Sequence, residues 1–274
     1  MPVGIMQGRL SNKVGKPLQS FPWDSWQEEF ARAAETGFDL IEWLVDGEHD
    51  EKNPIATESG RDEIKYLMAE YKVGVRSLCA HTFIDGALLK NGNSSLVAVN
   101  HLKDILNYSA EIGIEFVVLP VMDAMSLRSK SARDGLKKIL RSILSESDPF
   151  LLLESDLPGS ELAAFVDEVN SPKLGVLYDF GNANAMGFNI VEDISILGSR
   201  IREIHIKDRV HNNGPSHRLG EGDTLFLEGI QALAQSSWQG PVVLETPIFN
   251  NWKLEAVHNL AFTRDCLVKV NQKA

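Results

Sequence analysis

The fold is decided by one stretch, residues 150–179, which reads FLLLESDLPGSELAAFVDEVNSPKLGVLYD. It opens with a short apolar run at 150–154 and closes with a second run at 174–179. Between the two runs, apolar residues recur with the spacing of one helix face. Nearly continuous hydrophobicity over so few residues is typical of a parallel strand that is covered on both faces. The stretch therefore predicts a strand, a helix and a second parallel strand.

The same alternation extends along the whole chain and predicts the architecture. Short apolar runs rich in Val, Ile, Leu and Phe alternate with longer amphipathic segments, which we interpret as helices. The predicted strands cover residues 3–6, 38–44, 75–79, 116–119, 150–154, 174–179, 201–206 and 242–245. A doubly wound sheet uses the same alternation, but this number of units in a chain of 274 residues favours a (β/α)₈ TIM barrel. No Pro/Gly/Ser linker divides the chain, so we expect one domain spanning residues 1–274.

Composition limits the classes of partner. The net charge of −11 should repel a phosphate backbone, so we expect no nucleic-acid partner. No stretch approaches the roughly 20 apolar residues that cross a bilayer, and no secretory signal is visible at the start of the chain. The protein is therefore expected in the cytoplasm, without a membrane partner. A homo-oligomer is left open.

Ionisable side chains follow four consecutive predicted strands. Glu154 ends the fifth strand, Asp179 ends the sixth, His205 lies near the end of the seventh, and Glu245 ends the eighth. In a TIM barrel, functional groups gather at the carboxyl ends of the strands, and neighbouring strands lie about 4.8 Å apart. We therefore expect these four side chains to meet in one cluster.

Such a cluster favours a bound cation. Like charges 4 Å apart repel by about 4 kcal/mol at an effective dielectric constant near 20. Carboxylates with one imidazole suit a single divalent ion such as Mn²⁺, Mg²⁺, Co²⁺ or Zn²⁺. Taken singly, an Asp or Glu after a strand is more often a helix cap or a solvated loop residue. We interpret Glu42, inside the second run, as a partner of a metal ligand or a member of a buried ion pair.

Basic residues gather after the seventh strand, which is unusual in so acidic a chain. In TIM barrels the loops after strands seven and eight often bind phosphate, so these residues favour a phosphorylated or otherwise anionic substrate. The alternative is a solvated loop. His81 follows the third run and could face the same mouth, and Gln7 and Arg9 after the first strand are weaker candidates. The basic residues of the loop are Lys207, Arg209, His211, His217 and Arg218.

With these residues in hand, the chain resembles the sugar phosphate isomerase/epimerase family of xylose isomerase-like barrels. Its nearest subgroup is the pentulose or hexulose 5-phosphate 3-epimerases, which show a similar Asp-x-Gly-Asn after strand six and His-x-Lys-Asp after strand seven. The segments that carry the resemblance are GFDLIE (37–42), LCAH (78–81), LLE (152–154), YDFGN (178–182), IHIKD (204–208), LGEGD (219–223) and VLET (243–246).

The resemblance implies roles for particular residues. It implies that Glu154, Asp179, His205 and Glu245 bind one divalent metal and that Glu154 and Glu245 also act as the acid/base pair. Asn182 stands where free-ketose epimerases tend to carry a substrate-contacting His, which disfavours a tagatose- or psicose-type activity. The same Asn removes a ligand that the endonuclease IV relatives need for several zinc ions.

The expected function is that of a metal-dependent sugar epimerase or isomerase acting on a ketose, here a ketose phosphate, through an enediolate. The residues expected to bind the sugar or sugar phosphate are His81, Asn182, Lys207, Arg209, His217 and Arg218. Two alternatives stay open, namely a dehydratase of the inosose type that uses the same metal site and a non-catalytic sugar-binding barrel.

Overall fold

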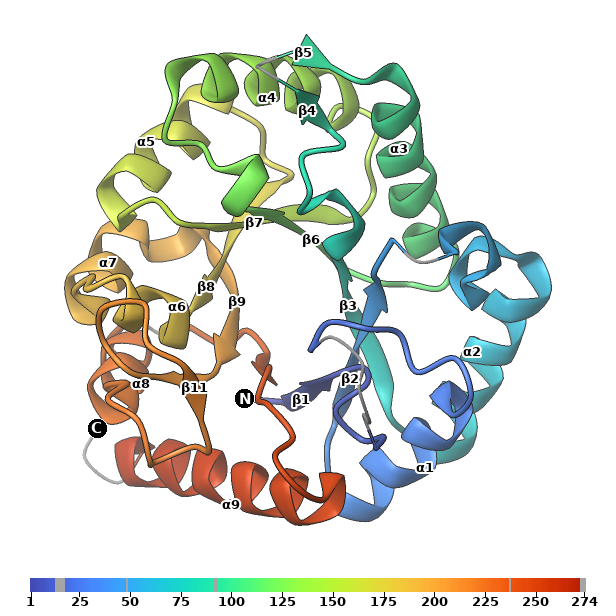
Figure 1. Ribbon diagram of the computed structural model, residues 1–274, viewed down its shortest axis with the longest axis vertical. Helices are drawn as coiled ribbons and strands as arrows, with labels where there is room; N and C mark the ends of the chain where they lie inside the picture. Colours follow the sequence, from blue (N-terminus) through green and yellow to red (C-terminus); the bar gives the residue numbers. More distant parts are fainter. Residues whose placement is uncertain (13–17, 48, 91–92, 237, 272–274) are drawn as a thin grey trace.

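The strands form a closed parallel barrel surrounded by helices (Figure 1). The computed structural model describes residues 1–12, 18–47, 49–90, 93–236 and 238–271. The order of strands around the ring is β1-β12-β9-β8-β7-β6-β3-β2. Their bounds are β1 Val3–Met6, β2 Leu40–Val45, β3 Gly74–Ala80, β6 Phe116–Val121, β7 Phe150–Ser155, β8 Leu174–Asp179, β9 Ile201–Ile206 and β12 Val242–Leu244.

Helices lie outside the ring and follow the strands in turn (Figure 1). The largest apolar cluster joins residues of the strands to the inner faces of these helices. This packing explains why the strands are apolar on the outward face, while each helix is apolar on one side only. The helices are α1 Trp26–Thr36, α2 Glu58–Tyr71, α3 Leu96–Glu111, α4 Lys130–Ile143, α5 Gly159–Val169, α6 Phe180–Ala185, α7 Ile190–Leu197, α8 Phe226–Gln235 and α9 Trp252–Asn271.

Short elements lie in the loops. Two-stranded hairpins are formed by β4 Leu89–Lys90 with β5 Asn93–Ser94 and by β10 Asp208–Arg209 with β11 Ser216–His217. The 3₁₀ helices are η1 Asp50–Lys52, η2 Pro54–Ala56, η3 His81–Phe83, η4 Asp123–Met125 and η5 Gly198–Arg200.

The predicted barrel is confirmed. The first strand pairs with β2 on one side and with β12 on the other, which closes the ring and excludes a doubly wound sheet. Each of the eight predicted runs forms a strand of this ring, with ends that shift by a few residues. The last strand stops at Leu244, so Glu245 is the first residue after β12 and not its final one. No helix in the described ranges is long and apolar enough to cross a membrane.

The barrel interior is only partly apolar. One small apolar cluster comes from β1, β2, β3 and β12, and another comes from β6, β7 and β8. Polar side chains are buried in the same interior, among them Glu42 from β2, Ser77 from β3 and Glu203 from β9. Each of these three is at most 2% exposed. Buried polar groups need hydrogen-bond partners. Ser77 contacts both glutamates, and Glu42 contacts His205 near the carboxyl end of β9.

Candidate functional site

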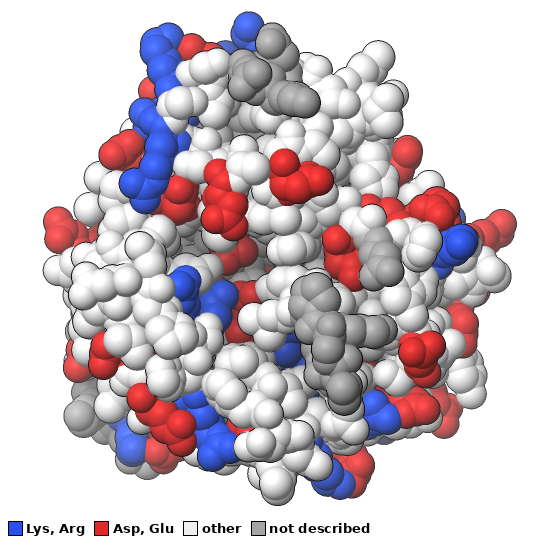
Figure 2. Space-filling view, in the orientation of Figure 1, with Lys and Arg blue, Asp and Glu red and all other residues white. Residues whose placement is uncertain are grey.

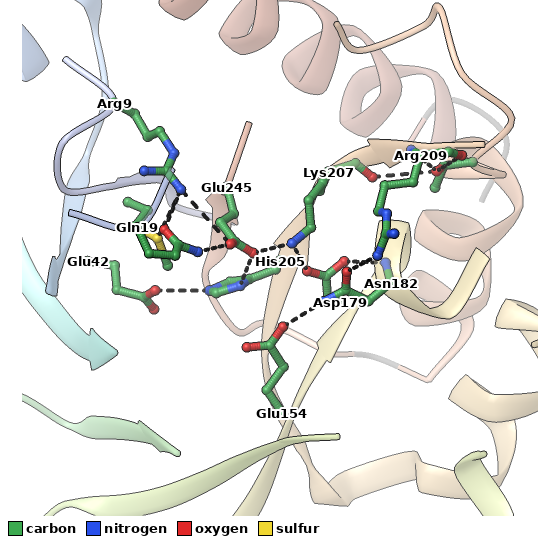
Figure 3. Close-up of polar contacts among 12 residues, drawn as sticks. Arg9, Gln19, Glu42, Glu154, Asp179, Asn182, His205, Lys207, Arg209 and Glu245 are labelled. Atoms are coloured by element: carbon green, nitrogen blue, oxygen red, sulfur yellow. Dashed lines mark hydrogen bonds and ion pairs between the residues drawn. The ribbon is translucent and has the colours of Figure 1, made fainter. Parts of the chain in front are cut away.

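The four predicted metal-ligating side chains meet at the carboxyl end of the barrel. Glu154 comes from β7, Asp179 ends β8, His205 lies in β9 and Glu245 follows β12, and all four are buried. One ligand atom from each lies within 4.8 Å of the others. The strand register explains the meeting, because His205 pairs with Asp179 on one side and with Val243, two residues before Glu245, on the other. Figure 3 shows the cluster.

Asp179 combines two roles that the sequence presented as alternatives. Its Oδ1 accepts a hydrogen bond of 2.8 Å from the backbone N–H of Asn182 and so caps α6. Its Oδ2 lies 3.0 Å from Nζ of Lys207. The helix can start here because residue 181 is glycine: a Cβ at Gly181 would lie 2.4 Å from the carbonyl oxygen of Lys207. This close approach fixes α6 against the end of β9.

His205 is held between two carboxylates. Its Nδ1 lies 3.2 Å from Oε2 of Glu245, and its Nε2 lies 3.0 Å from Oε1 of Glu42. Burial alone would lower the pKa of His205, but the two carboxylates raise it well above its usual value. Binding a metal at Nδ1 would therefore have to displace a proton, while the Nε2–H could keep donating to Glu42. Glu42 is thus a member of a buried ion pair with His205, one of the two interpretations drawn from the sequence, and the same contact would make it a partner of a metal ligand if His205 binds the ion.

Behind Glu42 lies a second carboxyl group that sequence analysis missed. The Ser77 hydroxyl lies 2.9 Å from Oε2 of Glu42 and 2.8 Å from Oε1 of Glu203. A hydroxyl has one proton to donate, so one of the two carboxyl groups must itself supply the other hydrogen. Burial and the nearby Glu42 raise the pKa of Glu203 well above its usual value. Glu203 is therefore the protonated member of the pair.

A lysine ammonium lies inside the carboxylate cluster. Nζ of Lys207 is 2.7 Å from Oε2 of Glu245 and 3.0 Å from Oδ2 of Asp179. Burial opposes the charge of Lys207, but the surrounding carboxylates raise its pKa above the usual value. Lys207 therefore stays protonated and partly balances the negative charge of the site.

Glu154 and Glu245 have contrasting environments. Burial and the negative charge of Glu245 raise the pKa of Glu154 to about 8. Burial would also raise the pKa of Glu245, but Lys207, His205 and Arg9 hold it well below its usual range. Two carboxyl groups whose surroundings push their pKa values apart are the usual signature of an acid/base pair.

The donor set fits a divalent cation. Three carboxyl groups and one imidazole provide the oxygen and nitrogen ligands that Mn²⁺, Mg²⁺, Co²⁺ and Zn²⁺ accept. Oδ2 of Asp179 is buried and accepts no hydrogen bond from any described residue; Lys207 contacts it only as an ion pair. A buried carboxylate oxygen without a hydrogen bond is costly, and a metal ion would satisfy it. Within the described ranges, Glu42, Glu203 and His205 form a second such group, which shares His205 with the first.

Four of the predicted substrate-binding residues line one cavity of about 300 Å³ above the cluster: His81, Asn182, Lys207 and Arg209. Asn182 donates a 2.9 Å hydrogen bond from Nδ2 to Oε1 of Glu154 and accepts one of 2.9 Å at Oδ1 from Nη1 of Arg209. Burial lowers the pKa of His81, so this imidazole is neutral near pH 7.

The other two predicted substrate-binding residues lie elsewhere. Arg218 donates from Nε and Nη2 to the two carboxylate oxygens of Glu255, at 2.9 and 2.8 Å. His217 lies on β11 opposite Asp208. Neither is among the described residues that line the cavity, to which this hairpin contributes Arg209 and Ser216. The charge of Arg218 is therefore used in an ion pair with α9, and the basic residues that this segment brings to the cavity are Lys207 and Arg209.

The segment before α1 contributes contacts that the sequence did not predict. Gln19 lines the cavity and donates from Nε2 to Oε1 of Glu245. Arg9 donates to the carbonyl oxygen of Leu18 (2.6 Å) and to Oε1 of Gln19 (2.5 Å), and its Nη2 lies 4.0 Å from Oε1 of Glu245. Arg9, one of the weaker candidates, therefore acts mainly by holding Gln19. Gln7, the other, accepts from the backbone N–H of Leu44 and lies outside the cavity lining.

The closed barrel and its buried donor cluster define a TIM-barrel protein with a polar centre at the carboxyl ends of its strands. More narrowly, the chain belongs to the family of xylose isomerase-like TIM barrels, which matches residues 30–266.

Its relatives include sugar epimerases. The L-ribulose-5-phosphate 3-epimerase UlaE of Salmonella heidelberg (strain SL476) is 25% identical over 244 residues, covering 81% of this chain and 82% of the relative. A solved L-ribulose 3-epimerase superposes with a TM-score of 0.76 at 18% identity, covering 100% of this chain and 97% of the other. The D-allulose 3-epimerase of a Methylomonas species, solved with D-allulose, gives 0.73 at 18% identity and 97% and 96% coverage.

Proposed function

We propose that the protein is a divalent-metal-dependent epimerase or isomerase of a keto sugar, with Glu154 and Glu245 as its acid/base pair. One observation carries the proposal: two buried carboxyl groups from non-adjacent strands of the ring converge on one centre. Their strands, β7 and β12, are separated by β8 and β9. Removing a proton from one face of a substrate and returning one to the other face requires such an arrangement.

The four clustered ligands would hold the metal, and a bound divalent ion would polarise the carbonyl group of the sugar as a Lewis acid. Glu245, kept ionised by Lys207, His205 and Arg9, accepts the proton from the carbon beside the carbonyl. Glu154, kept protonated by burial, returns a proton to the opposite face of the enediolate, which inverts that carbon. Each positioned acid or base contributes on the order of 10²- to 10⁴-fold. Asn182, which donates to Glu154, orients that carboxyl group toward the centre.

The relatives favour epimerisation over the two alternatives, because the similar proteins described above are named as 3-epimerases of sugars or sugar phosphates. A dehydratase would share the proton-abstracting step, and nothing in the cavity favours it specifically. A non-catalytic barrel would have no use for two carboxyl groups with opposite pKa shifts. The cytoplasmic location stays a prediction from the sequence.

The test is exchange of deuterium from D₂O into the carbon beside the carbonyl. The Mn²⁺-loaded protein is incubated with a panel of free ketoses and ketose phosphates and followed by NMR. Glu154→Gln and Glu245→Gln should each lower the exchange rate at least about 100-fold. Glu70→Gln, at an exposed position on α2, is the matched control and should keep the wild-type rate.

Metal content is measured on every variant, because either substitution also removes a metal ligand. Loss of exchange in a variant that still binds about one metal per chain supports the acid/base assignment. Retained exchange in both metal-loaded variants would contradict the proposal.

A further inference from the structure

We propose that a second cavity beside the metal cluster is a subsite for a neutral, hydroxyl-rich extension of the substrate, namely a glycosyl unit. The proposal rests on the proposed function, since it names what the epimerised sugar carries. The second cavity measures about 610 Å³, against about 300 Å³ for the first. Small-molecule sites usually measure about 300–1,000 Å³. The first cavity alone is therefore at the lower end of that range.

The two cavities adjoin and share part of their lining. Met122, Asp123, Asn182 and Arg209 line both of them. Figure 2 shows the hollow at the centre of this face, with acidic and basic side chains close together at its edge. A substrate bound at the metal cluster can therefore extend past Asn182 and Arg209 without leaving the protein surface.

Arg209 is fixed at the junction with donors to spare. Its Nε and Nη2 donate to the carbonyl oxygen of Gly214, both at 3.1 Å, and its Nη1 donates to Oδ1 of Asn182 at 2.9 Å. A guanidinium has five N–H groups, so one N–H on each Nη has no partner among the described residues. An orientation fixed by the backbone, with two donors left over, suits recognition of substrate oxygens at low entropic cost.

The charge of the second cavity indicates a neutral ligand. Arg128 donates from Nε to Oδ2 of Asp156 and from Nη2 to the carbonyl oxygen of the same residue, both at 2.9 Å, so this pair is internally neutralised. Asp123 adds a negative charge that offsets Arg209. Two arginines and two aspartates thus balance among the described lining residues. A phosphate dianion in this cavity would be repelled by the carboxylate of Asp123. Sugar hydroxyls, in contrast, can both donate to the carboxylates and accept from the arginines.

Two of the lining residues present free polar groups from turns. Asp123 and Asn213 both have left-handed backbone conformations, with φ of 50° and 57°. Neither side chain makes a hydrogen bond within the described ranges, although the backbone N–H of Asn213 donates to the carbonyl oxygen of Ala185 at 2.8 Å. Asp and Asn tolerate this conformation better than other non-glycine residues. The amide of Asn213 is therefore exposed and unengaged, and it lines the second cavity but not the first.

The test compares three ligands that share one ketose: fructose, isomaltulose (6-O-α-glucosyl-fructose) and fructose 6-phosphate. Their dissociation constants are measured by calorimetry on the Mg²⁺-loaded protein, and saturation-transfer NMR reports whether the glucosyl protons contact it. We expect isomaltulose to bind more tightly than fructose, and fructose 6-phosphate to gain no such advantage. Asn213→Gly keeps the positive φ and should reduce the ratio of isomaltulose to fructose affinity about 2- to 10-fold. Asn212→Gly, at an exposed neighbour with φ of 59°, is the matched control and should leave the ratio unchanged.

A second variant tests the charge argument. Asp123→Asn should improve binding of fructose 6-phosphate by up to about fivefold relative to isomaltulose. The inference is overturned if isomaltulose binds no more tightly than fructose in a protein that exchanges a free ketose, or if fructose 6-phosphate binds most tightly to the wild type. If no ketose in the D₂O panel exchanges, the proposed function fails, and the subsite fails with it.

Discussion

The two buried glutamates behind His205 should respond very differently to the same substitution. Glu42→Gln removes the carboxylate that lies 3.0 Å from Nε2 of His205. Replacing such a partner of a metal-ligating histidine typically weakens metal binding 10- to 100-fold, which corresponds to about 1.4–2.8 kcal/mol. We therefore expect a loss of that size in the affinity for Mn²⁺.

Glu203→Gln is the matched control. It lies in the same interior, is fully buried, and contacts the same Ser77 hydroxyl at 2.8 Å. Because Glu203 is already protonated, an amide replaces a neutral acid of nearly the same shape and can still donate to Ser77. Metal affinity should then change less than about threefold, since His205 and Glu42 keep their contact.

The assay is competition between the protein and a fluorescent chelator for Mn²⁺, with circular dichroism and urea unfolding to show that each variant is folded. The reasoning would be refuted if Glu203→Gln weakened metal binding as much as Glu42→Gln. It would equally be refuted if folded Glu42→Gln bound Mn²⁺ with wild-type affinity.

Four further outcomes are expected. The raised pKa of His205 means that a metal binding at its Nδ1 must displace a proton, so affinity should rise about tenfold per unit between pH 6 and 8; a flat calorimetric profile would contradict this. Because burial raises the pKa of Glu154 to about 8, its contribution to the stability of the chelator-treated protein is complete below pH 4.5 and lost as the pH rises through 8, a decline that thermal melts should record. Arg218→Ala leaves the buried carboxylate of Glu255 unpaired and should lower the free energy of unfolding by about 1–3 kcal/mol, without changing the affinity for sugars. A loss of sugar affinity in the folded variant would instead support the substrate contact predicted from the sequence. Gly181→Ala places a Cβ 2.4 Å from the carbonyl oxygen of Lys207, so it should lower the free energy of unfolding by about 1–3 kcal/mol and weaken metal binding. An unchanged melting temperature would contradict this, because it would show that α6 can shift to make room.

The barrel and the four clustered side chains could be predicted because both follow from periodicity. Parallel strands read as short apolar runs, and the residue that ends each run falls at the same edge of the barrel. Asp179 shows that two interpretations drawn from the sequence can both hold for one residue. The helix cap and the site residue, which the sequence presents as competing interpretations, are two oxygens of one carboxylate.

The remainder depended on contacts between distant segments. Glu203 lies in an apolar run, and its burial against Ser77, 126 residues earlier, has no local signal. Gln19 reaches Glu245 across 226 residues in the same way. Arg218 looked like a substrate contact because of its basic neighbours, but its partner lies on α9, and composition alone does not reveal which charges are already paired.

The position of Lys207 has a consequence for how the protein matures. Its ammonium supplies a permanent counter-charge to Asp179 and Glu245 from within the polypeptide. Self-repulsion among the clustered acids is thereby reduced while the last strands assemble, whatever the supply of metal at that moment. Assembly of the chain therefore need not wait for the proposed ion, because the counter-charge is already part of the polypeptide.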